Sequence, residues 1–386
     1  MQSSVKKREV FYLHGYDPRG ARFYYRLYKE HLLKQNKLNN LSASISSRKS
    51  KDGNSSWNIV AHENDIEVHT KYNFLAWNDI ISKNWARSIG DILKSYIYTV
   101  KTHIFTGLIV KYARISPYIM VNIMYITLYI SLLIALVFSV SYLANDFFLV
   151  YVPWYLSVLL SIALGYTILK MGIALGHKIA VFWILNINTF MSKWAEEKIN
   201  NMEDKVDTMS DTILTVLKES DEKSIDEVLL VAHSVGVAVL VPVLASLLKK
   251  CKEKDVDISK LKIVTIAGNI PMISYQKNAG FFRDDLRYIL EEQQLTWLDY
   301  TSKIDGLCFP LLDFSSLVNI DKQKEMGPTL ISTRFHKLFK KDFYECNKKR
   351  YKWAEIHFWY LMSHDYVGEY DYFRITAGSQ PLESFQ

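Results

Sequence analysis

Two long apolar stretches divide a chain whose other parts alternate between short apolar runs and polar, helix-forming segments. Residues 115–144 and 147–176 each exceed the roughly 20 residues that a helix needs to cross a hydrocarbon core of about 30 Å. Lys170 is the only charged residue in either stretch. Because soluble cores seldom contain two successive uncharged runs of this length, the pattern predicts a transmembrane helical hairpin that turns at Asn145 and Asp146.

The segment before this hairpin has the pattern of an opening α/β unit. An apolar run at residues 10–13 ends in a turn-forming stretch, and residues 21–35 then contain many helix formers with neither Gly nor Pro. The order of strand, loop and helix is typical of an α/β domain. Further on, the sequence predicts a polar surface loop, two strands and a long helical stretch, at residues 42–56, 57–61, 67–75 and 79–114.

The segment after the hairpin alternates strands and helices. A charged helical stretch, three buried strands and one intervening helix are predicted, at residues 192–220, 227–231, 261–267, 295–301 and 237–250. The apolar strand at 227–231 is of the kind buried in a parallel sheet, and the alternation of strands and helices is that of a sheet flanked by helices. We therefore expect an α/β fold with a mostly parallel sheet, made of residues 1–114 and 191–386. Residues 115–190 would form the hairpin and an apolar segment, 179–190, lying along the membrane interface.

Charge and cysteine content limit the partners and the types of site that the chain is expected to have. The formal net charge of +7 comes from dispersed Lys and Arg, so it suits contact with anionic lipid better than nucleic acid binding. Three cysteines without CxxC spacing favour neither disulfides nor a metal site. Basic residues flank the hairpin and its turn has none; by the positive-inside rule both soluble parts would be cytoplasmic. These residues are Lys101, Lys111, Arg114, Lys170, Lys178 and Lys193.

Ser234 stands in Ala232-His233-Ser234-Val235-Gly236, between a predicted strand and a predicted helix. Small residues two before and two after a serine permit the tight, strained turn of a nucleophile elbow, which raises the hydroxyl above the sheet edge. Ala232 departs from the more usual Gly. The alternative interpretation is an ordinary strand-to-helix turn with Ser234 as a helix cap.

Three pieces of the sequence resemble the α/β-hydrolase superfamily, particularly its lipases and esterases: VFYLHGY, LLVAHSVG and LTWLDYTSKID. The resemblance covers both soluble segments, with the hairpin as an insertion. It implies a triad in the order serine, acid, histidine. His14-Gly15 resembles the oxyanion loop of that family, which implies the backbone N–H groups of Tyr16 and Val235 as oxyanion donors.

The acid and the base have to be chosen among several residues. Asp305 follows the strand at 295–301 at the edge where α/β sites assemble, whereas Asp299 lies within that strand. His357 and His364 both follow Asp305; we favour His357, because His-x-x-Tyr resembles the catalytic histidine segment of several lipase-like families. His364 stays open as the alternative base, and His336 is the third choice.

The sequence thus predicts a membrane-anchored serine hydrolase that cleaves an ester or thioester of a hydrophobic acyl substrate. No cofactor is expected, since no Gly-rich phosphate loop is present, and no metal, since His62-Glu63 lacks a second histidine four residues after the first. Two alternatives remain. A non-catalytic membrane protein could keep the fold as an interaction module, and an acyltransferase could use the same triad.

Overall fold

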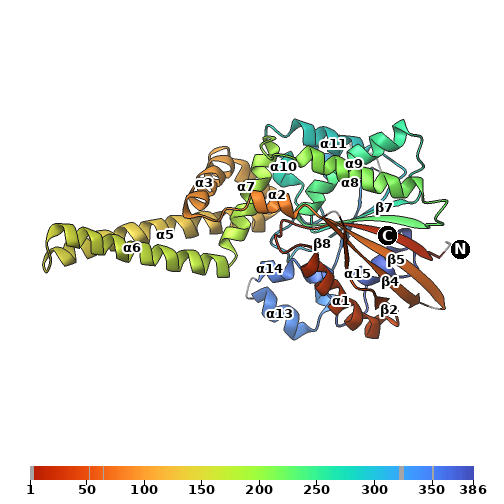
Figure 1. The fold of residues 1–386 in the computed structure, drawn as a ribbon, viewed down its shortest axis with the longest axis horizontal. Helices are drawn as coiled ribbons and strands as arrows, with labels where there is room; N and C mark the ends of the chain where they lie inside the picture. The colour runs from red at the N-terminus through yellow and green to blue at the C-terminus, as the bar shows by residue number, and fades with distance from the viewer. Residues whose placement is uncertain (1–3, 52, 64, 321–325, 350–351) are drawn as a thin grey trace. The chain divides into compact units, whose positions relative to one another are not determined.

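A computed structural model describes residues 4–51, 53–63, 65–320, 326–349 and 352–386 (Figure 1). The chain divides into two compact units, one made of residues 1–84 and 193–386 and the other of residues 85–192. Residues 85–114 therefore belong to the same unit as the predicted hairpin.

The first unit is built around a nine-stranded mixed sheet in the order β2-β4-β5-β1-β6-β7-β8-β9, with β3 paired to β4. From β5 to β9 all neighbouring strands are parallel, while β4 runs antiparallel to β5, β2 and β3. The prediction of an α/β fold with a mostly parallel sheet is confirmed. The strands are β1 (Lys7–Leu13), β2 (Ser42–Ile45), β3 (Lys49–Lys51), β4 (Asn54–Glu63), β5 (Ile66–Leu75), β6 (Glu227–His233), β7 (Leu261–Ile266), β8 (Thr296–Thr301) and β9 (Thr329–Ser332).

Burial explains which strands the sequence revealed. Every residue of β6 is buried, as expected for a central parallel strand, and β4 alternates buried positions with partly or fully exposed ones. The predicted surface loop at residues 42–56 is wrong, because it contains β2, β3 and the start of β4. These short strands lie at the sheet edge, where Ser and Lys are tolerated on the solvent side.

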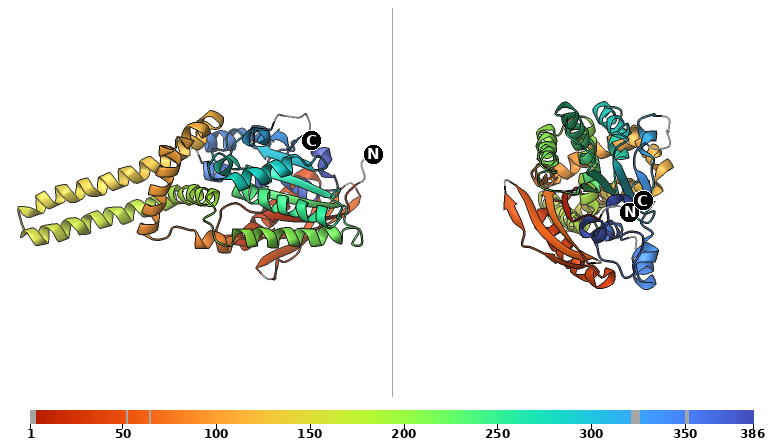
Figure 2. Two further views of the ribbon diagram at one scale, coloured as in Figure 1. Left: turned by 90° about the horizontal axis from the view of Figure 1, so that it is seen from above. Right: turned by 90° about the vertical axis from the view of Figure 1, so that its right-hand side faces the viewer.

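Helices cover both faces of the sheet (Figures 1 and 2). On one face α8 (Met202–Lys218), α9 (Val235–Glu253) and α11 (Gly280–Leu290) pack side by side. On the other, α1 (Gly20–Asn39) and α15 (Tyr372–Ala377) share an aromatic-rich core with the strands. The shorter helices of this unit are α2 (Asn78–Lys83), α10 (Pro271–Ser274), α12 (Phe335–Leu338), α13 (Lys341–Lys349) and α14 (Trp353–Ile356). Single 3₁₀ turns occur at Phe314–Leu317, Trp359–Leu361 and Leu382–Phe385.

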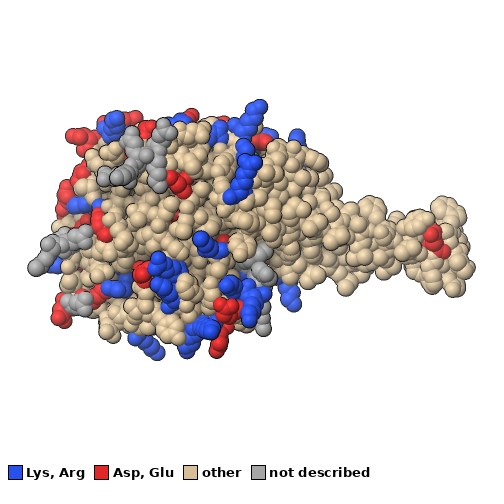
Figure 3. Space-filling model, turned by 180° about the vertical axis from the view of Figure 1, so that it is seen from behind, with Lys and Arg blue, Asp and Glu red and all other residues tan. Residues whose placement is uncertain are grey.

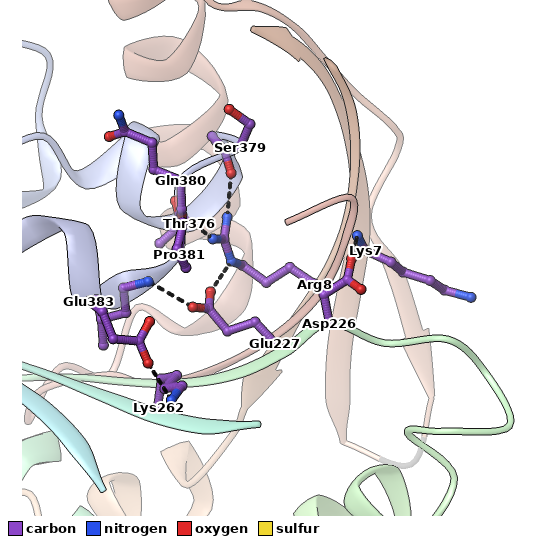
Figure 4. Close-up of polar contacts among 12 residues, drawn as sticks. Lys7, Arg8, Asp226, Glu227, Lys262, Thr376, Ser379, Gln380, Pro381 and Glu383 are labelled. Carbon is purple, nitrogen blue, oxygen red and sulfur yellow. Dashed lines mark hydrogen bonds and ion pairs between the residues drawn. The ribbon is translucent and has the colours of Figure 1, made fainter. Parts of the chain in front are cut away.

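The C-terminal segment is fixed to the amino ends of β1 and β6 by a buried ion pair (Figure 4). Arg8 Nε donates to Glu227 Oε2 at 2.5 Å, and both side chains are almost fully buried. The Arg8 guanidinium also donates to the carbonyl oxygens of Gly378 and Gln380, at 2.8 and 2.9 Å. The backbone N–H of Leu382 donates to Glu227 Oε1 at 2.9 Å. The two ends of the chain are thereby joined through the strand that precedes Ser234.

The second unit is entirely helical in its regular structure. It contains α3 (Ile89–Thr99), a π-helical turn (Val100–Phe105), α4 (Leu108–Ile115), α5 (Pro117–Leu149) and α6 (Trp154–Lys178). The long helical stretch expected over 79–114 is helical for most of its length, but it is divided into α2, α3, the π turn and α4. Ser88 caps α3 in a capping box with Asp91, and Gly107, at a φ of 72°, separates the π turn from α4.

α5 and α6 form the predicted hairpin, and both are long and apolar enough to cross a membrane. Residues 117–178 contain only three Lys, Arg, Asp or Glu residues, and a largely uncharged surface is visible along the pair in Figure 3. The helices approach closely at Gly165 and Gly172, where an added methyl group would lie 2.2 Å from Ser141 Oγ and 2.3 Å from Leu133 Cδ1.

The turn of the hairpin is not at Asn145 and Asp146, as predicted, but at residues 150–153, after α5 has continued to Leu149. Asn145 remains helical and its carbonyl oxygen accepts a hydrogen bond from Ser157 Oγ at 2.7 Å. Pro153 then precedes the first turn of α6. Beyond the hairpin, most of the apolar segment 179–190 lies in α7 (Val181–Ala195), whose side chains are mostly buried.

Candidate active site

Ser234 occupies the turn between β6 and α9 with a backbone that non-glycine residues rarely adopt, at φ 61° and ψ −128°. Such strain costs about 1–3 kcal/mol and is typical of functional sites. A methyl group at Gly236 would lie 2.3 Å from the carbonyl oxygen of Leu13, and one at Gly15 would lie 2.9 Å from Ser234 Cβ. The small residues are therefore required where the elbow meets the loop after β1. Ala232 is buried within β6, opposite Leu13.

The turn that carries Ser234 lies between the two central strands of the sheet, at their carboxyl ends. β1 pairs with β5 on one side and with β6 on the other, so the chain continues in opposite directions from these two central strands. Their carboxyl ends form a topological switch point, which is where open α/β sheets bind their ligands. Ser234 follows β6 and His14 follows β1, so both lie at this point.

Asp305 and His357, 52 residues apart in the chain, are brought into contact in the interior of the first unit. His357 Nδ1 lies 2.8 Å from Asp305 Oδ2, and both side chains are buried. The backbone N–H of Leu307 donates to the other carboxylate oxygen at 3.0 Å. Asp305 is thus held in the orientation that would fix the His357 ring with Nδ1 protonated and Nε2 available as a base.

The alternative base, His364, lies elsewhere. Its ring packs against Phe339 and Tyr370, and within the described part of the chain neither ring nitrogen has a hydrogen-bond partner. Burial lowers the pKa of His364 to about 4. Its backbone N–H donates to Gln35 Oε1 at 2.8 Å. His336, the third choice, is exposed on α12.

Ser234 is buried, and among the described residues its Oγ is hydrogen-bonded neither to His357 nor to any other group. Hydrogen bonds between a nucleophile and its base are often long in the absence of substrate and tighten when substrate binds. Of the three residues of the predicted triad, the structure therefore joins Asp305 and His357, and the turn between β6 and α9 holds Ser234 separately.

The two predicted oxyanion donors come from different segments: Val235 directly follows Ser234, and Tyr16 lies in the loop after β1. Val235 is the first residue of α9, so its N–H has no acceptor within its own helix. Tyr16 is buried in the loop after β1. This loop is folded on itself, because the Gly15 carbonyl oxygen accepts hydrogen bonds from the Asp17 N–H and from His14 Nδ1, each at 2.8 Å.

His14 has a packing role in this loop. Its ring stacks on Phe74 at 4.7 Å between centroids, and its carbonyl oxygen accepts a hydrogen bond from Trp77 Nε1 at 3.0 Å. Burial lowers the pKa of His14 to about 4, so the ring is neutral at physiological pH.

Sequence reasoning missed the contribution of His233. Its Nε2 lies 2.9 Å from the carbonyl oxygen of His357, and the two rings are 4.8 Å apart between centroids. Burial lowers the pKa of His233 well below its ordinary value, so the neutral ring acts as donor. The residue next to Ser234 thus holds the backbone of the candidate base. The only signal in the sequence was the position of His233 directly before Ser234.

The described residues contain no group of three or more His, Cys, Asp or Glu side chains placed to hold a metal ion. Comparison with protein-family models, with curated proteins and with solved structures finds no match to this chain.

Proposed function

We propose that the chain is a membrane-anchored serine hydrolase with Ser234 as nucleophile, His357 as base and Asp305 as the orienting acid. The observation that carries the proposal is the buried 2.8 Å contact between His357 Nδ1 and Asp305 Oδ2, linked through His233 to a strained Ser234. A buried histidine–carboxylate pair beside an elbow is the arrangement that activates a hydroxyl for acyl transfer.

In the proposed reaction Ser234 Oγ attacks the acyl carbon of an ester or thioester and gives its proton to His357 Nε2. The N–H groups of Val235 and Tyr16 stabilise the oxyanion of the tetrahedral intermediate. The imidazolium, stabilised by Asp305, then protonates the departing alcohol or thiol. A water molecule, deprotonated by His357, attacks the acyl-serine in a second tetrahedral step that releases the carboxylic acid and restores Ser234.

An α/β-hydrolase architecture is part of the proposal. It is supported by the strand order β5-β1-β6-β7-β8, in which the oxyanion loop, the serine and the acid follow β1, β6 and β8, three parallel strands. It is also supported by the order of Ser234, Asp305 and His357 along the chain.

The hairpin makes a hydrophobic acyl substrate the natural proposal. If α5 and α6 cross a bilayer, the site is tethered to the membrane, which raises its effective concentration toward lipid-borne esters. The basic residues that flank the hairpin favour a cytoplasmic position for both chain segments outside it.

A fluorophosphonate probe tests the proposal on the full chain in detergent. We expect stoichiometric labelling of the wild type, none of Ser234→Ala, and unchanged labelling of Ser44→Ala, which alters an exposed serine of β2. Absence of labelling in folded wild-type protein, or equal labelling of Ser234→Ala, would refute a catalytic serine and favour the non-catalytic alternative. Product analysis with added alcohol or amine then separates a hydrolase from an acyltransferase.

A further inference from the structure

An exposed apolar stripe runs along α3, outside the proposed site. Ile89, Leu93 and Ile97 follow one another at a spacing of four residues and are 38%, 45% and 57% exposed. The opposite side of the same helix is buried, at Ile92, Ser95 and Thr99. The helix therefore packs through one large apolar residue and two small polar ones, and presents three large apolar side chains outward, which is unusual for a helix on a water-soluble surface.

The exposed apolar surface continues beyond α3. Phe105, in the π turn, is 82% exposed, and Val110, in α4, is 53% exposed. Bulky apolar side chains this exposed on consecutive elements indicate a site that contacts a membrane or a partner.

Positive charge accompanies these apolar side chains. Residues 85–116 contain five Lys or Arg residues and a single acid, Asp91. Lys94, Lys101 and Arg114 are exposed, and none of the three forms a salt bridge with a residue that the structure describes. Apolar side chains flanked by Lys and Arg are the pattern of a helix that lies in the plane of an anionic membrane surface.

A contact between α3 and α5 shows at which level along the hairpin α3 lies. Tyr96 OH lies 2.6 Å from Ser131 Oγ on α5. The buried residues of α5 end at Ile130, just before this contact. From residue 131 to the end of α5 at Leu149 there are 19 residues, about 28 Å of helix at about 1.5 Å per residue, close to the thickness of a hydrocarbon core.

α6, the second helix of the hairpin, has a free part of the same length. Tyr129 OH donates to the carbonyl oxygen of Gly172 at 2.7 Å, so Gly172 lies beside the beginning of the free part of α5. Trp154 to Gly172 is again 19 residues. In Figure 2 the orange helices of this unit, α3 and α4, lie across the base of the hairpin. The contact of α3 with α5 thus lies at the end of the hairpin away from its turn, at the level where the free parts of α5 and α6 meet the rest of the unit.

We propose that residues 89–115 form an anionic-lipid collar, a segment that lies in the headgroup region around the base of the hairpin. Leu93, Ile97 and Phe105 would insert at the acyl boundary while Lys94, Lys101 and Arg114 contact lipid phosphates and carboxylates. The collar rests on membrane insertion of the hairpin and is independent of the chemistry at Ser234. Charge complementarity and continuity with the spanning helices favour lipid over a protein partner.

A polarity-sensitive fluorophore on a single cysteine tests the collar in the full chain. Ile97→Cys is made in a Cys346→Ser background, because the other two cysteines are buried. We expect blue-shifted emission, and quenching by spin labels near the headgroup, in vesicles of phosphatidylcholine with about a third phosphatidylserine. Leu33→Cys, on an equally apolar exposed position of α1, is the control and should report water.

Charge reversal tests the lipid class. Lys94→Glu/Lys101→Glu/Arg114→Glu should abolish the difference in quenching between phosphatidylserine-containing and pure phosphatidylcholine vesicles. The control Lys37→Glu/Lys49→Glu/Lys51→Glu, which reverses three exposed charges in the other unit, should leave that difference unchanged. A difference that survives the first triple change overturns the anionic-lipid assignment.

The outcomes separate the collar from the membrane anchor. Release of the chain from vesicles by alkaline carbonate would refute insertion of the hairpin itself. Retention of the chain with the fluorophore of the Ile97→Cys variant still in water would refute the collar alone. Energy transfer between fluorophores on different copies, rising with protein density, would assign this face to self-association instead.

Discussion

Two aspartates at β8 show how burial and partners decide the role of a residue. Asp305, beyond the strand, is bonded to His357 and to a backbone N–H. Asp299, within the strand, is buried with no basic partner among the described residues, and it accepts a hydrogen bond from Thr265 Oγ1 at 2.6 Å. Trp297 Nε1 donates to the same Thr265 oxygen at 3.0 Å. Burial raises the pKa of Asp299 to about 7, so this carboxyl belongs to an internal network and not to a charge pair.

The raised pKa of Asp299 predicts a stability that depends on pH. Because the pKa in the folded state is above the ordinary value of about 3.9, its contribution is fully present below pH 4 and is lost as the pH rises through 7. This difference in pKa between the folded and unfolded chain corresponds to on the order of 4 kcal/mol. Asp299→Asn should flatten the fall in melting temperature between pH 5 and 8. Identical pH profiles for wild type and variant would contradict this assignment.

The choice between the two candidate bases is a second prediction for single residues. His357→Gln should lower the rate of fluorophosphonate labelling by about 10³-fold or more, because it removes the base bonded to Asp305. His364→Gln should leave that rate within a few-fold, provided that its melting temperature shows a folded protein. A larger loss in the His364 variant would transfer the role of base to that residue.

At the scale of elements, the elbow depends on the contact of α9 with β1. Gly236→Ala places a methyl group 2.3 Å from the Leu13 carbonyl oxygen, and rigid backbone on both sides prevents relief. We expect a loss of about 1–3 kcal/mol in unfolding free energy, as for overpacked sites, together with slower labelling of Ser234. Gly280→Ala, at the start of α11 with no atom within 4 Å of the new methyl group, is the matched control. Similar losses in both variants would contradict the steric argument.

The same contacts explain what the sequence could and could not predict. The central strands could be predicted from the sequence because β6 is fully buried and therefore mostly apolar. The elbow could be predicted because its small residues follow a steric rule. β2 and β3 were missed because their stability comes from pairing with β4 and not from their own Ser- and Lys-rich residues. Chain order alone left two histidines open as partners of Asp305, since either could fold back onto β8. Only tertiary structure puts His357 there.

For the whole molecule, the ion pair of Arg8 and Glu227 joins the N-terminal strand, the strand before Ser234 and the last residues of the chain. Removing one partner leaves a buried charge uncompensated, which costs about 3–5 kcal/mol, whereas replacing both with apolar residues of similar volume is often neutral. Arg8→Met should therefore lower the unfolding free energy strongly and expose residues 378–386 to proteolysis.

The double variant Arg8→Met/Glu227→Met separates these contributions. It should recover most of the lost stability, yet the C-terminal segment should stay sensitive to protease, because the carbonyl oxygens of Gly378 and Gln380 have lost their guanidinium donor. Lys34→Met, which breaks an exposed ion pair with Glu30 on α1, should change neither measurement appreciably. A double variant as unstable as Arg8→Met alone would mean that the guanidinium hydrogen bonds to the C-terminal segment, and not the buried charge of Glu227, dominate the closure of this end of the sheet.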